Sequence, residues 1–384
     1  MRLRHVDGTI VHLAYCSNVH QAEDVDGVIG QLATYAEPVR KRLGADRLGI
    51  GLWLARPVVT ELVEQPGLLA RLRAELDSRG LETVTLNAFP YSGFHREVVK
   101  RDVYRPDWAD EQRLAYTLDC ARVLAALLPD DAARGSVSTL PLGWRTFWSP
   151  ERADLARTAL DRLAEGLATV HARTGRRIRV GFEPEPGCVV QTTAQAVTEL
   201  SAVDPEWLGI CLDTCHLAVQ FEDPAAAVAR LLAAGLPVVK IQASAAVEAP
   251  APGDPDARRA LARLAEPRFL HQTRGRSGGG VAEVDDLPEA LDGGLRDDVP
   301  WRVHFHAPLN AEPEHPLRTT TPQLRMALAE LVGGSAALCD HIEVETYTWS
   351  VLPHPTDDLV GGIAAELAWS ADTLTGLGLT RESR

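Results

Sequence analysis

The stretch IRVGFEPEPG (178–187) is followed further along the chain by the stretch LGICLDTCH (208–216). Both stretches begin with a short run of apolar and β-branched residues and become polar where that run ends. Such runs are typical of strands in a parallel sheet whose outer face is covered by helices. The pattern therefore predicts two buried parallel strands, each of which ends in polar side chains.

Runs of the same kind recur on both sides of these stretches, and helical patterns separate them. The segment 66–80 places leucines on one stripe and ends in glycine, a frequent helix stop. The residues SPE at 149–151 form a helix start, with an N-cap serine, a first-turn proline and an acid near the positive end of the helix dipole, and that helix is expected to end near 175. Another helix is expected over 223–235. The expected strands lie at residues 10–15, 48–54, 81–86, 136–142, 178–182, 208–212, 238–241, 301–305 and 341–344.

The alternation of strands and helices predicts the fold class. About eight strand–helix units fit an α/β fold, the closed (β/α)8 TIM barrel, which takes roughly 250 residues and tolerates insertions. The chain has 384 residues, and the surplus lies mainly at 243–300. We interpret 1–384 as a single barrel and 243–300 as a loop and short-helix insertion after the seventh strand, over the barrel mouth. An open doubly wound sheet is the alternative, but no strand is followed by a G-x-G-x-x-G turn.

Composition limits the class of protein. With 45% apolar residues the chain can bury a large core, which excludes a disordered chain. The 53 acidic and 39 basic residues leave a net charge of −14, which argues against a nucleic-acid partner. The six cysteines form no C-x-x-C pair, no apolar run approaches the roughly 20 residues of a membrane span, and the N-terminus lacks a signal-like apolar region. These features favour a cytoplasmic protein with reduced thiols.

Polar residues follow the two strands quoted first. Catalytic residues of a TIM barrel lie at the carboxyl ends of its strands. Glu183 and Glu185 stand two apart, so an extended backbone points them to one face. Asp213 and His216 follow the next strand in a D-x-x-H spacing. Solvated loop acids and a structural Asp–His hydrogen bond are the alternative interpretations of these two pairs.

Three later runs end in the same way. Gln242 offers a neutral oxygen, His304 and His306 share one strand face, and Glu343 and Glu345 share another. Two imidazoles on one face suit a borderline metal ion or acid–base work. Buried carboxylates are costly unless they are paired, protonated or bound to a cation. The acids gathered at three strand ends therefore predict a divalent metal ion.

Several of these runs also resemble a known family. The runs FEPEPG (182–187), CLDTCH (211–216) and ET (345–346), in this order, resemble the xylose isomerase-like TIM barrel superfamily, which includes sugar (phosphate) isomerases and epimerases and abasic-site nucleases of the endonuclease IV type. The runs HLAYCSNVH (12–20), FLHQ (269–272), HFHAP (304–308) and EVETYTW (343–349) look like the metabolite traffic protein EboE family, which belongs to bacterial gene clusters implicated in moving biosynthetic precursors. The resemblance covers nearly the whole chain.

The resemblance implies a set of metal ligands. They fall on Glu183, Asp213, Gln242 and Glu345, and His306 takes the place of the histidine that the superfamily usually has where Gln242 stands. Glu183 is preferred to Glu185 because the glycine four residues later matches the superfamily pattern, and Glu185 stays a candidate. The ion is Mn²⁺, Mg²⁺ or Zn²⁺, and the sequence leaves its identity open.

The activity expected from this resemblance is a metal-dependent isomerase or epimerase of a sugar or polyol (phosphate). It would remove a proton next to a carbonyl, with Glu183, Glu345 and His216 as the catalytic residues. The expected substrate-binding residues are Glu185, His216, His271, Arg274 and His304, and Arg274 with Arg276 could grip a phosphate or carboxylate. The EboE resemblance places this chemistry in the processing or traffic of a secondary-metabolite precursor.

Two other functions stay open at this stage. The first is a non-catalytic trafficking component whose tryptophans near strand ends would suit an apolar precursor, namely Trp53, Trp144, Trp148 and Trp349. The second is an abasic-site nuclease, against which the charge of −14 and the glutamine at 242 both argue. The expected partner is a small molecule, with no nucleic acid and no membrane span, and a homodimer is left open.

Overall fold

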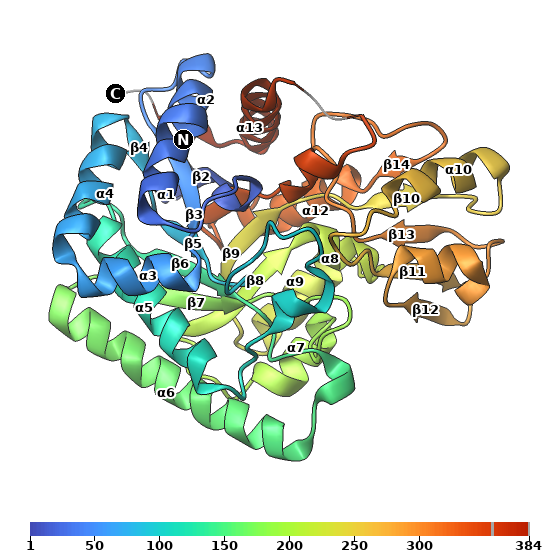
Figure 1. Ribbon diagram of the computed structural model, residues 1–384, viewed down its shortest axis with the longest axis horizontal. Helices are drawn as coiled ribbons and strands as arrows, with labels where there is room; N and C mark the ends of the chain where they lie inside the picture. Colours follow the sequence, from blue (N-terminus) through green and yellow to red (C-terminus); the bar gives the residue numbers. More distant parts are fainter. Residues whose placement is uncertain (355–356, 383–384) are drawn as a thin grey trace.

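Eight parallel strands close into a barrel at the centre of the computed structural model, which describes residues 1–354 and 357–382 (Figure 1). Each strand is hydrogen-bonded to two neighbours, and the circle closes where β2 pairs with both β15 and β3. This α/β architecture is the TIM barrel that the alternating pattern predicts. Around the circle the strands are β2 (Ile10–Cys16), β15 (His341–Val344), β9 (Val238–Ala243), β8 (Leu208–Asp213), β7 (Ile178–Phe182), β6 (Gly135–Thr139), β5 (Thr85–Asn87) and β3 (Leu48–Trp53).

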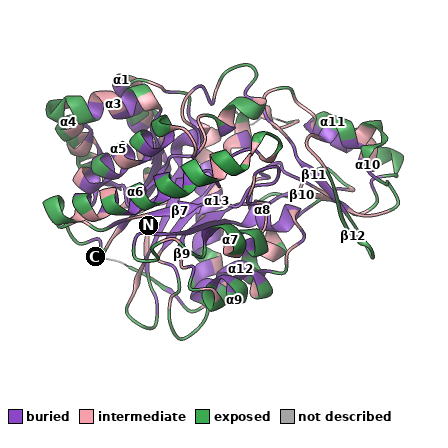
Figure 2. Ribbon diagram, turned by 90° about the horizontal axis from the view of Figure 1, so that it is seen from below, coloured by how far each residue is buried: buried purple, intermediate pink, exposed green. Residues whose placement is uncertain are grey.

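Helices cover the outside of the barrel and turn their exposed faces to solvent (Figure 2). Helix α6 begins where the sequence predicts, since the Ser149 side chain accepts a hydrogen bond from the Arg152 amide, and it ends at Gly175, whose φ of 71° is left-handed. The helices of this layer are α1 (Val25–Gln31), α2 (Glu37–Arg42), α3 (Arg56–Glu64), α4 (Pro66–Ser78), α5 (Glu111–Leu127), α6 (Pro150–Thr174), α7 (Thr193–Leu200), α9 (Pro224–Ala233), α12 (Thr321–Val332) and α13 (Leu359–Gly376). The short helix α8 (Thr214–Val219) follows β8 directly and is entirely buried.

A second sheet of five antiparallel strands lies at one side of the barrel (Figure 1). It packs a core of its own, in which Trp301 and Leu261 are fully buried. The chain enters this sheet after β9 and returns to the barrel layer at α12. Its elements are β10 (Val247–Ala249), α10 (Pro255–Leu264), β11 (Thr273–Ser277), β12 (Gly280–Val284), α11 (Leu287–Glu289), β13 (Trp301–Val303) and β14 (Arg318–Thr319).

This sheet corrects two predictions. The run 301–305 is not a barrel strand, because its first residues form β13, which pairs antiparallel with β10 and β11. The insertion predicted at 243–300 therefore continues through β14. An apolar alternating run packs equally well in either sheet, so its hydrophobic pattern alone could not identify its partners.

Smaller differences concern the strand ends. The run 81–86 forms two short strands, β4 (Leu81–Glu82) and β5, because residues 83 and 84 interrupt the pairing with β3. Two short antiparallel strands, β1 (Arg2–Arg4) and β16 (Thr380–Arg381), extend the barrel sheet beside β2. The six cysteines are all unpaired and buried. Among the described residues, no helix combines the length and the apolar character needed to cross a membrane.

Candidate active site

Three carboxylates converge at the carboxyl ends of the barrel strands, and we call them the carboxylate cluster. Glu183 follows β7, Asp213 ends β8 and Glu345 follows β15. One oxygen of each lies within 4.8 Å of the others, and each residue is at most 4% exposed. Two oxygens of these residues, Glu183 Oε2 and Asp213 Oδ2, meet no hydrogen-bond donor among the described residues. Buried, unpaired anionic oxygens are what an oxygen-binding cation would satisfy.

Neighbouring groups hold the other oxygens of the carboxylate cluster. Asp213 Oδ1 accepts hydrogen bonds from the His216 amide and from Ser244 Oγ, both at 2.8 Å. Glu345 Oε1 accepts from the side-chain amides of Asn18 at 2.7 Å and Asn87 at 2.9 Å. These bonds orient Asp213 and Glu345, and each uses only one oxygen of its carboxylate.

Gln242 lies on β9, between the strands that carry Asp213 and Glu345. It is fully buried, and both atoms of its side-chain amide lack a partner among the described residues. An unpaired buried amide costs free energy unless another group meets it. The side chain can therefore serve as the neutral oxygen ligand that the sequence predicts.

The pKa shifts of the carboxylate cluster also indicate a site that binds protons or a cation. Burial, reinforced by repulsion from Glu345 and Asp213, raises the pKa of Glu183 well above its ordinary range. Burial and repulsion from Asp213 and Glu343 do the same to the pKa of Glu345. The cluster must therefore hold either protons or a cation at neutral pH, because three neighbouring buried charges are too unfavourable.

Three histidines beside the carboxylates form what we call the imidazole cluster: His216 on α8, and His304 and His306 in the segment after β13. Their Nδ1 atoms each face an oxygen acceptor: the Pro184 carbonyl at 3.0 Å, Gln272 Oε1 at 2.7 Å and the Glu345 carbonyl at 2.7 Å, in that order. Nδ1 must then carry the proton, which leaves the Nε2 lone pairs pointing inward.

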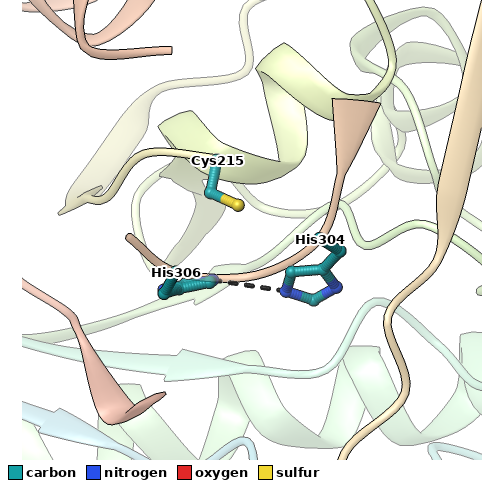
Figure 3. Close-up of side chains that lie close together, drawn as sticks. All are labelled: Cys215, His304 and His306. Carbon is teal, nitrogen blue, oxygen red and sulfur yellow. Dashed lines mark hydrogen bonds between the residues drawn. The ribbon is translucent and has the colours of Figure 1, made fainter. Parts of the chain in front are cut away.

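The Nε2 atoms of this cluster converge. They lie 3.1 Å apart between His216 and His304 and 3.2 Å apart between His304 and His306. The Cys215 thiol lies beside His304 and His306 (Figure 3). Close contact between nitrogen lone pairs is favourable only with a proton or a cation between them, so these donors can share an ion with Asp213 or hold a substrate hydroxyl.

A pocket lies above the two clusters, and Glu185 connects the imidazole cluster to Tyr104, which also lines this pocket. Its Oε2 lies 3.0 Å from His216 Nε2, and its Oε1 accepts a hydrogen bond from the Tyr104 hydroxyl at 2.7 Å. Burial raises the pKa of Glu185 above its ordinary value. A proton shared between Glu185 and His216 would satisfy both groups. Glu183 thus belongs to the carboxylate cluster and Glu185 to the imidazole cluster.

A buried ion pair lies in the layer below. Lys240 Nζ is 2.7 Å from Glu343 Oε2, and both side chains are fully buried. Burial, the largest single influence, lowers the pKa of Lys240, but attraction to Glu343 together with smaller contributions from Cys211 and Cys16 raises the pKa overall. Gly51 makes room for the pair, because a Cβ there would lie 1.3 Å from Glu343 Oε1. Glu343 is therefore a partner of Lys240 and not a member of the carboxylate cluster.

Some predicted site residues lie elsewhere. Arg274 is buried and its guanidinium donates to the Val284 carbonyl at 2.7 Å and to Gln191 Oε1 at 2.9 Å, outside the pocket. Arg276 lies over the Phe221 ring. His271 contacts Glu266 and the His304 carbonyl and does not line the pocket. The four tryptophans named above also lie outside the pocket lining.

Three residues of this site were not predicted from the sequence. Asn18 and Asn87 hold Glu345, and Tyr104 holds Glu185. Asn18 and Asn87 come just after the strand runs 10–15 and 81–86, so the rule that identified the acids could have identified them too. Tyr104 ends a 3-10 helix, Lys100–Tyr104, in the long segment between β5 and α5 and carries no such signal.

Comparison with known proteins identifies the family. The family model described as xylose isomerase-like TIM barrel matches residues 41–273. A search of curated proteins found no match. Similar solved structures include a xylose isomerase-like TIM barrel protein from Mycobacterium smegmatis in complex with magnesium, 16% identical, with a TM-score of 0.52 over 96% of this chain and 97% of that one. A candidate sugar phosphate isomerase/epimerase from Anabaena variabilis is also 16% identical, with a TM-score of 0.50 over 96% and 99% of the two chains. The chain belongs to the xylose isomerase-like TIM barrel family.

Proposed function

We propose that this protein is a divalent-metal-dependent isomerase or epimerase that acts on a sugar or polyol. The observation that carries the proposal is the carboxylate cluster, in which buried oxygens of Glu183 and Asp213 lack any donor among the described residues. Among the described residues, no lysine or arginine forms an ion pair with Glu183, Asp213 or Glu345, and the nearby Lys240 is paired with Glu343. The cluster is thus prepared for an ion from solution.

The donor set favours a hard ion. Glu183, Asp213 and Glu345 supply carboxylate oxygens, the ligands that Mg²⁺ and Mn²⁺ prefer, and the unpaired amide of Gln242 on the neighbouring strand would add one more oxygen. His306 adds a nitrogen near Asp213, which would also suit Mn²⁺ or Zn²⁺. The magnesium in the Mycobacterium smegmatis structure supports the same choice.

The chemistry follows from what surrounds the ion. When bound, a divalent ion draws in adjacent carbonyl and hydroxyl oxygens of a substrate and acidifies the C–H between them. Glu183 and Glu345 approach from different strands, and we propose that one takes the proton and the other returns it. Their burial, which raises both pKa values, suits groups that must hold a proton briefly. His216 and His306 present Nε2 lone pairs to the same space and can accept hydrogen bonds from substrate hydroxyls.

Proton exchange tests the proposal. The protein is loaded with Mn²⁺ and incubated in D₂O with a panel of free ketoses and keto-polyols, and deuterium incorporation next to the carbonyl is followed by NMR. We expect incorporation with at least one substrate and its loss in Glu345→Gln. The matched control Glu199→Gln changes an exposed carboxylate on α7 and should behave as the parent protein. Absence of Mn²⁺ binding, or of exchange across the panel, would reject the proposal.

The resemblance to the EboE family suggests where this chemistry is used. We propose that the natural substrate is a precursor of a secondary metabolite. The test is the same exchange reaction carried out on an extract fraction of such precursors, with product identification by mass spectrometry.

A further inference from the structure

The pocket above the two clusters has a polar floor and an apolar wall. The floor is formed by polar residues of the two clusters and their neighbours, namely Asn18, Asn87, Glu183, Glu185, Glu345, His216, His304 and His306. Aromatic and aliphatic side chains form the wall, and they come from outside the barrel strands: Phe89, Pro90, Phe94, Val99, Val103 and Tyr104 from the segment between β5 and α5, Phe269 and Leu270 from the insertion, and Tyr347 from the segment after β15.

The wall is a packed structure and not a set of separate loops. The rings of Phe94, Phe269 and Tyr347 contact one another, with centroids 5.1 Å, 5.4 Å and 4.9 Å apart. The amides of Val99 and Lys100 both donate to the Arg268 carbonyl, at 2.8 Å and 2.9 Å. These bonds join the segment between β5 and α5 to the insertion, so the wall has a defined shape.

The charges around the pocket do not suit a phosphate. Among the described residues that line it, Lys100 is the single Lys or Arg, and its Nζ is already paired with Asp286 at 2.6 Å. Arg274 donates elsewhere, as described above. A phosphate would also be repelled by the carboxylates of the floor. Phosphate recognition normally uses arginine forks, and no arginine is among the described residues that line this pocket.

We propose that the substrate is an unphosphorylated polyol or hydroxy-ketone joined to an aromatic body. The oxygen-rich end would lie on the floor, and the aromatic body would pack against Phe94, Phe269 and Tyr347. This inference rests on the proposed function, because the floor is taken to bind the oxygens through a divalent ion. An aromatic body buried against three rings is expected to increase affinity about ten- to a hundredfold.

A matched set of chelators tests the proposal without knowledge of the sugar. Acetohydroxamate, phenylacetohydroxamate and phosphonoacetohydroxamate share a two-oxygen end and differ only in carrying hydrogen, phenyl or phosphonate. Mn²⁺ binding is measured first by calorimetry, and each chelator is then titrated into the loaded protein. We expect phenylacetohydroxamate to bind at least tenfold more tightly than acetohydroxamate, and phosphonoacetohydroxamate no more tightly than acetohydroxamate.

Variants locate the effect. Phe269→Ala should remove the advantage of the phenyl compound and leave the affinities for Mn²⁺ and acetohydroxamate unchanged. Phe269→Leu keeps more of the side-chain volume and should lose part of the affinity advantage of the phenyl compound. This variant serves as the test if the alanine variant does not fold. The control Phe147→Ala removes a phenylalanine that is 59% exposed and outside the pocket, and should change nothing.

The outcomes separate the two proposals. Failure to bind Mn²⁺ rejects the proposed function. Mn²⁺ binding with no preference for phenyl, with preference for phosphonate, or with no chelator binding at all overturns the substrate class. Chelator selectivity as expected but no deuterium exchange supports the pocket and rejects the isomerase chemistry.

Discussion

Two layers of the barrel interior hold buried carboxylates, and the layers differ in how the carboxylate charge is compensated. In the lower layer Glu343 is paired with the ammonium of Lys240 at 2.7 Å. In the upper layer Glu183, Asp213 and Glu345 lie close together. Among the described residues that line the pocket above them, Lys100 is the single lysine or arginine, and it is paired with Asp286. One layer is complete as folded, whereas the other depends on protons or an added ion.

The difference teaches how a barrel separates stability from chemistry. A buried ion pair contributes little net stability, yet it removes its charges from further reaction. An uncompensated cluster destabilises the fold, but that same free energy becomes affinity when a cation arrives. The following predictions challenge this contrast, from the largest expected effect to the smallest.

Removal of the lower cation should be severe. Lys240→Met leaves Glu343 buried without its partner, and we expect a loss of about 3–5 kcal/mol in the free energy of unfolding, measured by urea denaturation. The double variant Lys240→Met/Glu343→Leu removes both charges and should recover most of that loss. If Lys240→Met alone lowered the free energy of unfolding by less than about 1 kcal/mol, this would contradict the view that the lower layer is a compensated pair.

Removal of an upper ligand should spare the fold and abolish metal binding. Asp213→Asn keeps an oxygen to accept from the His216 amide and Ser244, so the metal-free protein should be at least as stable as the parent because repulsion is relieved. We expect Mn²⁺ affinity to fall at least a hundredfold by calorimetry, about 2.7 kcal/mol.

The matched control is Asp223→Asn. Asp223 is the N-cap of α9 and accepts from the Ala226 amide, as Asp213 does at α8, but it lies away from the cluster. Asparagine caps a helix as well as aspartate, so this variant should keep both stability and Mn²⁺ affinity. Equal loss in both variants would mean that capping, and not coordination, explains the effect.

Protons should compete with the ion in the upper layer. The pKa values of Glu183 and Glu345 are raised, so above the ordinary carboxyl range the folded metal-free protein binds more protons than the unfolded chain. Its free energy of unfolding should therefore fall as pH rises from about 4.5. Mn²⁺ affinity should rise with pH over the same window, up to about tenfold per pH unit for each proton displaced. A flat affinity between pH 5 and 8 would show that the cluster is ionised without the metal.

The smallest effect is expected from the groups that orient Glu345. Asn87→Ala removes one of its two amide donors, while Asn18 remains. We expect Mn²⁺ affinity to fall about tenfold, as for other residues that hold a metal ligand, with little change in the unfolding midpoint. The combined variant Asn18→Ala/Asn87→Ala should lose more than either alone.

Much of the upper layer could be predicted from the sequence, because parallel strands deliver the residues that follow them to one end of the sheet. Glu183, Asp213 and Glu345 needed only that rule. That rule does not predict the course of the chain between the barrel strands. The run 301–305 has the pattern of a barrel strand, but the chain has already left the barrel at Val247, and its partners are β10 and β11.

Arg274 shows a second limit of sequence reasoning. An arginine beside a glycine-rich turn in an acidic chain suggests an anion site, yet its guanidinium donates to a backbone carbonyl and to Gln191. A long side chain can reach in several directions, and its choice depends on acceptors that come from distant segments. The aromatic wall was missed for the same reason, since Phe94, Phe269 and Tyr347 meet only after folding.

The origin of the wall in loops has a consequence for how such proteins diverge. The floor belongs to strands whose register is shared around a closed barrel, so a change there disturbs its neighbours. The wall belongs to connecting segments that tolerate substitution and changes in length. Descendants of this chain could therefore acquire new substrates by altering residues 89–104 and 269–270 while the reaction stays the same. Related proteins are better sorted into specificity groups by these segments than by their acidic residues.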